Sequence, residues 1–285
     1  MRVGVVGLGR MGLPMALRMA AAGHEVMGFD TSAEASQRAA AAGLATVADL
    51  GGLSGCAVVC SSLPGSGDVE RVYCSTGGLL EVLAPPAVAA DLSTVSVKTS
   101  RRVAAEARRR SIGFLDAPVS GTSIHAEAGT LTVMVGGPAQ ALETARGVLE
   151  TFSSRVDRVG DNGSGLLLKL ISNRLLTTYL GAIAEAVVAL ERTGLDVAQG
   201  IELLRAGAAG RQLDYKAEPM AARDFAPMFT VDLMRKDLRL AAEALGEARL
   251  ADAARAILEE TAAAGRGSQD LGALITAVEQ YMEGP

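Results

Sequence analysis

The chain of 285 residues has few of the side chains on which several common protein classes depend. It has no Trp and only 3% aromatic residues, so we expect Ala, Leu and Val to pack the core. Only two histidines are present, His24 and His125, which argues against a zinc site. The three cysteines, Cys56, Cys60 and Cys74, lack the spacing of a metal site or a disulfide framework. They indicate reduced thiols in a cytoplasm, and we expect no metal.

The charge and the N-terminus exclude further classes. The formal net charge is −5 and the pI is about 5.2, so we expect no nucleic-acid or anionic-membrane partner. Arg101–Arg102 and Arg108–Arg110 are interpreted as solvated helix faces. We expect no signal peptide in the first residues, because the apolar run Val3–Val6 is short and leads into a glycine turn. The length suits one large domain or two ordinary ones.

Short apolar runs alternate with helix-like stretches through the first half of the chain. This alternation predicts an α/β, Rossmann-like, doubly wound and mostly parallel sheet. The expected strands are Arg2–Val6, Glu25–Phe29, Ala57–Ser61, Val88–Asp91, Gly113–Asp116, Leu131–Val135 and Arg155–Val159. The expected helices between them include Leu13–Ala22, Ser32–Ala42, Val97–Arg110 and Ala139–Thr151.

No strand-like run follows Gly165. Leu166–Arg192 is apolar enough to raise the question of a membrane span. Lys169, Arg174 and Glu185 interrupt it, and we interpret it as a helix buried in protein. Further helices are expected at Asp196–Ala206, Arg211–Ala222, Thr230–Ala248, Ala251–Ala264 and Ser268–Met282, with Asp196 and Ser268 as N-caps. We therefore predict two domains, residues 1–162 and an all-α domain of residues 163–285.

The N-terminal strand, glycine turn, helix and second strand follow the order of a dinucleotide-binding unit. The turn reads Gly7-Leu8-Gly9-Arg10-Met11-Gly12. Gly7 permits the tight turn, Gly9 lets the backbone approach a pyrophosphate, and Gly12 lets the helix pack close to the strand. The N–H groups at the start of the helix can then bind the phosphates. A tight glycine turn in some other α/β protein is the alternative interpretation.

Asp30 ends the second strand, near the spacing expected of an acid that binds the adenosine ribose. A carboxylate there repels a 2′-phosphate, and no Arg follows it. The sequence therefore favours NAD over NADP, although Thr31 and Ser32 are able to hydrogen-bond a phosphate.

Lys169 is the candidate catalytic residue. Asn173 and Thr177 follow it at intervals of four, so the three side chains share one helix face. A lysine with little water around it has a lowered pKa and exchanges protons near neutral pH, as nicotinamide chemistry requires. In the alternative interpretation, Lys169 covers apolar surface with Asn173 as its partner. The spacing alone leaves both open.

A polar loop follows the strand that ends at Asp116, where open α/β sheets bind ligands. Its Ser120, Gly121 and Thr122 offer N–H and hydroxyl groups to a substrate carboxylate. An ordinary polar turn is the alternative. His125 follows in the same loop; we interpret it as an exposed loop residue, and contact with the substrate is the alternative.

Two more loops after expected strands contain Leu63-Pro64 and Thr94, which we expect to line the cofactor. Lys236 and Asp237 are either a surface charge pair or a pair whose lysine reaches back to the cofactor.

These motifs, taken in order, resemble the β-hydroxyacid dehydrogenase family, the group of 3-hydroxyisobutyrate dehydrogenase. The resemblance covers nearly the whole chain. It rests on GLGRMGLPMA (7–16), SSLP (61–64), DLST (91–94), DAPVSG (116–121), AGTLTVMVGG (128–137), Lys169 with Asn173, KDL (236–238) and GRGSQD (265–270).

The resemblance implies a role for each matching position. Lys169 is expected to be the general acid and base, Asn173 to position the substrate, and Ser120, Gly121 and Thr122 to bind its acidic head group. The expected cofactor residues are Gly7, Leu8, Gly9, Arg10, Met11, Gly12, Asp30, Leu63, Pro64, Thr94 and Lys236. The resemblance also implies a homodimer or homotetramer built through the helical domain.

Two positions depart from the family pattern next to the expected substrate site. Thr122 stands where many members have a second glycine, and Ser172 stands where many have another Asn. The stretch 122–125 resembles the loop of the sulfolactaldehyde reductases in this family. We therefore expect an NAD(P)-dependent enzyme that interconverts a 3-hydroxyisobutyrate-like acid and its semialdehyde.

Three alternatives remain. The substrate can be a related small acidic aldehyde, of the succinic, tartronate semialdehyde or sulfolactaldehyde type. An imine reductase shares the two-domain plan, but such relatives lack the active-site lysine. A non-catalytic NAD-binding protein has no need of Lys169, Asn173 and the 120–122 loop together.

Overall fold

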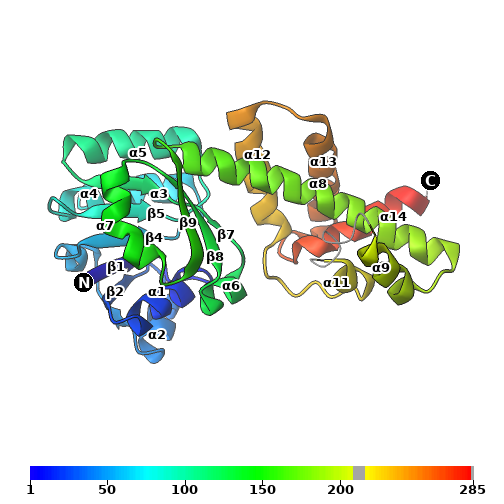
Figure 1. Cartoon of the computed structure of the whole chain (residues 1–285), viewed down its shortest axis with the longest axis horizontal. Helices are drawn as coiled ribbons and strands as arrows, with labels where there is room; N and C mark the ends of the chain where they lie inside the picture. The colour runs from blue at the N-terminus through cyan, green and yellow to red at the C-terminus, as the bar shows by residue number, and fades with distance from the viewer. Residues whose placement is uncertain (208–215, 284–285) are drawn as a thin grey trace. The chain divides into compact units, whose positions relative to one another are not determined.

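The computed structural model describes residues 1–207 and 216–283 and divides into two compact units, Met1–Lys169 and Leu170–Pro285 (Figure 1). The first unit is built on a nine-stranded sheet with the order β3-β2-β1-β4-β5-β6-β8-β7, and β9 pairs with β8. The strands are β1 (Arg2–Val6), β2 (Glu25–Phe29), β3 (Ala45–Thr46), β4 (Val58–Ser61), β5 (Val88–Asp91), β6 (Gly113–Asp116), β7 (Val119–Ser120), β8 (Leu131–Gly136) and β9 (Ser153–Gly160).

The sheet is parallel from β3 to β6 and from β8 to β9, and it is antiparallel where β8 meets β6 and β7. The predicted doubly wound α/β fold is therefore confirmed. The helices of this unit are α1 (Gly12–Ala21), α2 (Ala33–Ala41), η1 (Leu50–Leu53), α3 (Ser66–Cys74), α4 (Leu79–Val82), α5 (Val97–Arg109), α6 (Ser123–Ala128) and α7 (Ala139–Leu149).

Alternation along the strands gives the sheet two apolar faces. Val3, Val5 and Val58 belong to one buried cluster with apolar residues of α1, α2 and α7. The intervening positions face the other way, and there Phe114 of β6 meets Tyr73 of α3 edge to face, with 5.5 Å between ring centroids. Burial on both faces explains why these strands read as continuous apolar runs.

The first turn of α8 (Ser164–Thr193) is anchored to the end of β6. The Asp116 carboxylate accepts hydrogen bonds from Gly163 N (2.7 Å) and Leu166 N (3.1 Å), two N–H groups at the start of the helix. Gly165 lies against the strands, since a Cβ there would be 2.3 Å from Met134 O and 2.6 Å from Asp116 O. Both contacts bring the helix backbone onto the sheet.

The second unit is helical. Besides the rest of α8 it has α9 (Val197–Ala206), α11 (Ala217–Ala221), α12 (Val231–Leu245), α13 (Arg249–Thr261), η2 (Ala262–Arg266), η3 (Leu271–Leu274) and α14 (Ile275–Glu283). Its core takes Leu180, Ile183, Ala184, Val187 and Val188 from α8, which recur at the spacing of one helix face.

Several expected boundaries in the second unit need correction. Ser268 is not an N-cap, because Asp270 caps the short helix η3 through Gly272 N, and α14 begins at Ile275. Residues 211–215 of an expected helix lie outside the described residues, and its described part is α11. The Asp196 N-cap is confirmed by its hydrogen bond from Gln199 N (2.7 Å).

Helix α8 is, within the described residues, the one helix long and apolar enough to cross a membrane by length and composition. In the most apolar stretch of 18 residues in this helix, 39% of the stretch is buried inside the protein. The buried positions include Leu166, Leu170 and Leu180, so the burial that the sequence predicts is confirmed for only part of the helix surface. Leu175 and Ile171 are about half exposed.

The homodimer or homotetramer that the family resemblance implies stays a prediction.

Replacing Gly165 with Ala is expected to destabilise the protein by about 1–3 kcal/mol, because the new methyl group would overlap backbone atoms of β8 and β6. Gly181→Ala is the matched control on the same helix, where the nearest atom to the new Cβ is Ile257 Cδ1 at 3.8 Å. There the gain in helix propensity should leave stability unchanged or higher by up to about 1 kcal/mol. Urea unfolding measures both, and equal effects at the two positions would contradict the close contact.

Candidate active site

The glycines of the first loop differ in what the chain itself demands of them. Gly7 has φ +90°, and a Cβ there would be 2.2 Å from Ser62 O. A Cβ on Gly12 would be 1.8 Å from Gly7 O, so the turn and the helix require glycine at both positions. At Gly9 no described heavy atom lies within 4 Å of a built Cβ. Internal packing therefore does not explain Gly9, whereas a ligand that lies on the backbone does.

Gly7 and Gly9 open into a cavity of about 260 Å³ at the carboxyl ends of β1, β2 and β4. Asp30, Leu63 and Pro64 also line it, as the sequence predicts for a cofactor site. Helix α1 begins beside this cavity with no acidic residue in its first turn and no side-chain cap, which leaves its N-terminal end available to phosphates. The residues present fit a dinucleotide.

Asp30 holds the glycine loop as well as facing the cavity. Its Oδ2 accepts from Leu8 N and its Oδ1 from Ser32 N, both at 2.7 Å. Each carboxylate oxygen has a second lone pair, so ribose hydroxyls can still bind. The Leu8 side chain lies in the core, and only its backbone belongs to the loop.

A buried carboxylate joins the two other cofactor loops. Asp91 Oδ1 accepts from Ser61 Oγ (2.8 Å) and from Ser93 Oγ (2.6 Å). Leu63 N in turn donates to Ser93 Oγ (2.8 Å), so the loops that carry Leu63 and Thr94 are tied together at neighbouring strand ends. Burial raises the pKa of Asp91 to about 6, against the hydrogen bonds from Ser93 and Ser61 that lower it.

Lys169, Asn173 and Thr177 lie on one face of α8 and are 9%, 2% and 0% exposed. Thr177 Oγ1 donates to Asn173 O (2.8 Å). Because Asp116 binds the first turn of α8, the position of Lys169 is set by the sheet. Burial raises the pKa of Asp116, while N–H donors from Gly163 and Leu166 and the Asn162 amide oppose that rise.

Asp237 of α12 connects two residues that the sequence predicts for the site. Asn173 Nδ2 donates to Asp237 Oδ2 (2.7 Å), and Lys236 Nζ lies 3.2 Å from Asp237 Oδ1. Asp237 is 2% exposed, so it is not part of a surface charge pair. Its hydrogen bond fixes the orientation of the Asn173 amide.

The predicted substrate loop is stiffened by His125, the residue whose role the sequence leaves open. Thr122 N donates to His125 Nδ1 (3.2 Å), and Thr122 Oγ1 lies 3.0 Å from the same nitrogen. Thr122 is buried and His125 is exposed. The Ser120 hydroxyl makes no hydrogen bond with any other described residue, so it is the polar side chain of this loop that stays available.

The structure does not gather all the predicted residues around one cavity. Of the predicted cofactor residues, the lining of the glycine-loop cavity contains Gly7, Gly9, Asp30, Leu63 and Pro64, but not Leu8, Arg10, Met11, Gly12 or Thr94. Lys236 and Asn173 belong to the second unit, so their place relative to the cofactor stays a prediction.

Sequence reasoning missed Asp68 and Arg71, an ion pair on α3 that lines the same cavity. The available signal was an acid and a base three residues apart in the stretch after Leu63-Pro64.

A glycine loop at the carboxyl ends of a parallel sheet, with an acid after the second strand, defines a dinucleotide-binding protein. Comparison with known families agrees. A family model described as the NAD binding domain of 6-phosphogluconate dehydrogenase matches residues 2–160. A second, described as NAD-binding of NADP-dependent 3-hydroxyisobutyrate dehydrogenase, matches residues 163–278. The chain belongs to the β-hydroxyacid dehydrogenase family, which confirms the predicted oxidoreductase class and NAD as cofactor.

Individual relatives cover most of the chain. An NAD-dependent L-serine dehydrogenase of Pseudomonas aeruginosa is 36% identical over 85% of this chain and 85% of its own length. A 3-sulfolactaldehyde reductase of Escherichia coli is 30% identical over 97% of this chain and 95% of its own length. The solved structure of a Mycobacterium tuberculosis 3-hydroxyisobutyrate dehydrogenase with L-serine has a TM-score of 0.88 and 33% identity, covering 97% of this chain and 98% of that one.

Gly9→Ala is expected to weaken NAD binding by about tenfold or more while leaving the thermal midpoint unchanged, because its methyl group meets no protein atom. Gly67→Ala in α3 is the control, since a Cβ there also meets nothing and Gly67 does not line the cavity. Titration calorimetry with NAD distinguishes the two variants. Equal affinity for NAD in both would contradict the assignment of Gly9 to the cofactor.

Asp91→Asn is expected to change how stability depends on pH. The pKa of Asp91, about 6 in the folded chain, is above the ordinary 3.8, so the native state binds more protons. Asp91 therefore lowers the stability of the parent protein as the pH rises from about 4 to about 6, and its effect levels off above that. Urea unfolding at pH 5, 6 and 7.5 should show this decline reduced in Asp91→Asn. Parallel curves for both proteins would refute the raised pKa.

Proposed function

We propose that the protein interconverts a small β-hydroxy acid, similar to 3-hydroxyisobutyrate, and its semialdehyde or ketone. The observation that carries the proposal is the polar face of α8, where Lys169 and Asn173 are buried one turn apart on a helix anchored by Asp116. The names of the relatives support the substrate class, because serine, hydroxyisobutyrate and sulfolactaldehyde are all small acidic molecules with a hydroxyl or aldehyde group.

Lys169 is the proposed general base in the oxidation. Its Nζ takes the proton of the substrate hydroxyl as the C–H bond gives up its hydride, and in the reduction it returns that proton to the carbonyl oxygen. NAD supplies the hydride acceptor when it is bound. Because Lys169 is only 9% exposed, bulk water has little access to its side-chain nitrogen, which favours direct proton exchange with a bound substrate. The neutral amine accepts the proton in the oxidation, and the resulting ammonium group donates it in the reduction.

Asn173 and the 120–122 loop are the proposed substrate-positioning groups. Asn173 donates one amide N–H to Asp237, which leaves its carbonyl oxygen and the other N–H for a substrate. Ser120 and Gly121 supply polar groups for the acidic end, while the Thr122 N–H is held by His125.

A related small acidic aldehyde, of the succinic, tartronate semialdehyde or sulfolactaldehyde type, is the second candidate substrate. One observation favours it: His125 fixes Thr122 within the loop proposed to bind the head group. A threonine side chain at this position reduces the space next to the head group. Selection between a carboxylate and a sulfonate would then depend on Ser120, Gly121 and Thr122.

Lys169→Ala should lower turnover by about 10²–10⁴-fold, the usual contribution of a general acid or base, and leave NAD affinity within a factor of a few. Cofactor absorbance follows turnover with 3-hydroxyisobutyrate, serine and their homologues, and in reverse with succinic, tartronate and sulfonated semialdehydes. Lys98→Ala, an exposed lysine on α5, is the control and should behave like the parent.

The outcomes separate the candidates. Turnover that survives Lys169→Ala would defeat the role of Lys169, even if the substrate class is correct. Fast reduction of the sulfonated aldehyde, with slow oxidation of 3-hydroxyisobutyrate, would favour the second candidate. No turnover on any of these compounds by a parent protein that binds NAD would favour the non-catalytic alternative.

A further inference from the structure

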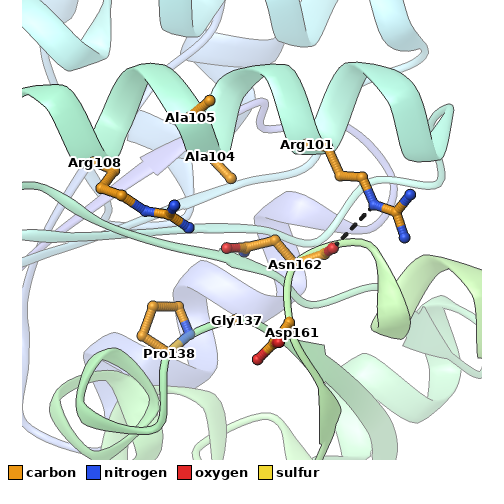
Figure 2. A pocket seen from close by; sticks show the side chains of 8 residues that line it. All are labelled: Arg101, Ala104, Ala105, Arg108, Gly137, Pro138, Asp161 and Asn162. Atoms are coloured by element: carbon orange, nitrogen blue, oxygen red, sulfur yellow. Dashed lines mark hydrogen bonds between the residues drawn. The ribbon is translucent and has the colours of Figure 1, made fainter.

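A second cavity, of about 450 Å³, lies in the first unit away from the glycine loop (Figure 2). It shares no lining residue with the cofactor cavity. Its wall is formed by α5, by the turn between β8 and α7, and by the turn between β9 and α8. The lining residues are Arg101, Ala104, Ala105, Arg108, Gly137, Pro138, Asp161 and Asn162. Its volume is in the range of small-molecule sites.

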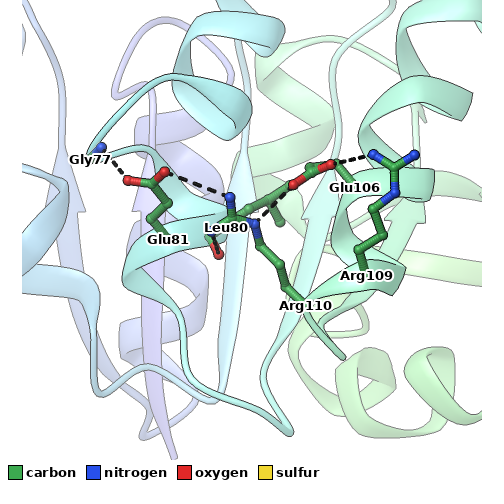
Figure 3. A network of polar contacts seen from close by, with 6 residues as sticks. All are labelled: Gly77, Leu80, Glu81, Glu106, Arg109 and Arg110. Carbon is green, nitrogen blue, oxygen red and sulfur yellow. Dashed lines mark hydrogen bonds and ion pairs between the residues drawn. The ribbon is translucent and has the colours of Figure 1, made fainter.

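The arginines of α5 divide into two groups. Arg102 pairs with Glu70, and Figure 3 shows Arg109 and Arg110 paired with Glu106, with Arg110 also reaching Glu81. Arg101 and Arg108, which line the cavity, have no carboxylate partner among the described residues. Arg101 donates through Nε to Asn162 O (3.3 Å), and Arg108 makes no hydrogen bond or ion pair there. The unneutralised arginines of this helix are therefore those at the cavity.

The remaining charges around the cavity do not cancel these arginines. Asp161 is the acidic residue of the lining, and its carboxylate is bound by Arg158 Nη2 (2.9 Å). Arg101, Arg108 and Arg158 thus stand against two carboxylates, Asp161 and the buried Asp116, whose Oδ1 lies 3.5 Å from Asn162 Nδ2 and which also binds N–H groups of Gly163 and Leu166. The cavity therefore keeps an excess of guanidinium groups, although the whole chain has a net charge of −5. Figure 2 shows Arg101 and Arg108 projecting from α5 on either side of Asn162. Such an excess of guanidinium groups at a concave surface attracts oxyanions.

We propose that this cavity binds a small metabolite carrying several phosphate or carboxylate groups, through the guanidinium groups of Arg101 and Arg108. A neighbouring cavity of about 170 Å³ shares Ala104, Arg108, Pro138 and Asn162 with it, so the apolar part of a larger ligand has room beside the charged part. Ser111 and Phe114 line that extension. Guanidinium groups bind both kinds of oxyanion through paired N–H donors.

The floor of the cavity is connected to the anchor of α8. Asn162 Nδ2 donates to Phe114 O (3.0 Å), and Gly163, the next residue, donates to Asp116. Arg101 already holds the backbone of Asn162. A ligand bound by Arg101 therefore rests on the turn that leads into α8, and its presence should slow local opening of that turn.

Titration calorimetry with tripolyphosphate and with citrate, on the full chain saturated with NAD, tests the proposal. Saturation keeps the probes out of the cofactor cavity. At least one probe should bind the parent, and Arg101→Gln with Arg108→Gln should weaken that binding by about tenfold or more. The matched control is Arg102→Gln with Arg109→Gln, which removes the same charge from the same helix and should change affinity less than threefold. Preference for one probe distinguishes a phosphorylated from a carboxylated ligand.

Hydrogen exchange locates the bound probe. Amides of residues 161–166 should exchange more slowly when the probe is present in the parent and in the control variant, but not in the cavity variant. If the double variant does not fold, Arg108→Gln alone replaces it in both measurements, because this substitution removes no hydrogen bond. Equal weakening in both double variants, protection confined to residues 7–12, or no binding of either probe at low ionic strength would each overturn the proposal.

Discussion

The hydrogen bonds between the Asp116 carboxylate and the first turn of α8 are the constraint on which the proposed active site depends. Asp116 ends a strand inside the sheet, and α8 carries Lys169 three residues beyond Leu166, less than one helical turn from the second bonded N–H group. The bonds satisfy amides that a helix start leaves unpaired, and they are charge-assisted. The contact of Gly165 with β6 and β8 fixes the distance from helix to sheet. Together these contacts fix the position of Lys169 relative to the end of β6.

A second buried carboxylate, Asp91, ties the cofactor loops together in the same way, and the charge of Asp116 makes the ionisation of Asp91 more costly. Burial is the main reason that the pKa of each is raised, and the charge of Asp116 adds to the rise at Asp91. A neutral polar residue would avoid that cost. A carboxylate, however, accepts several hydrogen bonds at once, and each acid joins groups distant in sequence: Ser61 to Ser93, and β6 to the start of α8.

The sequence predicts two kinds of element: those whose apolar pattern continues over many residues, and those that need a particular residue for a local contact. The glycine loop and the apolar strands are of these kinds, because Gly7 and Gly12 serve contacts within a few residues of themselves or on the next strand. Helix α6 and strand β7 were missed, since they are too short to show a period. The partnerships of Asp116 with Leu166 and of Asp237 with Asn173 join residues some 50 or more positions apart. No spacing rule of a single sequence reports such pairs.

The same difference explains why the reaction class is easier to read than the substrate. Cofactor recognition needs backbone N–H groups and the absence of a side chain at Gly9. The sequence shows this requirement directly, as glycines at fixed positions in the loop. Substrate recognition depends on side chains whose donors are already divided among other partners. Thr122 N–H is taken by His125, and one amide N–H of Asn173 by Asp237, while Ser120 stays available. Which head group fits is set by the donors that remain, and these are known only once the folded chain has placed every partner.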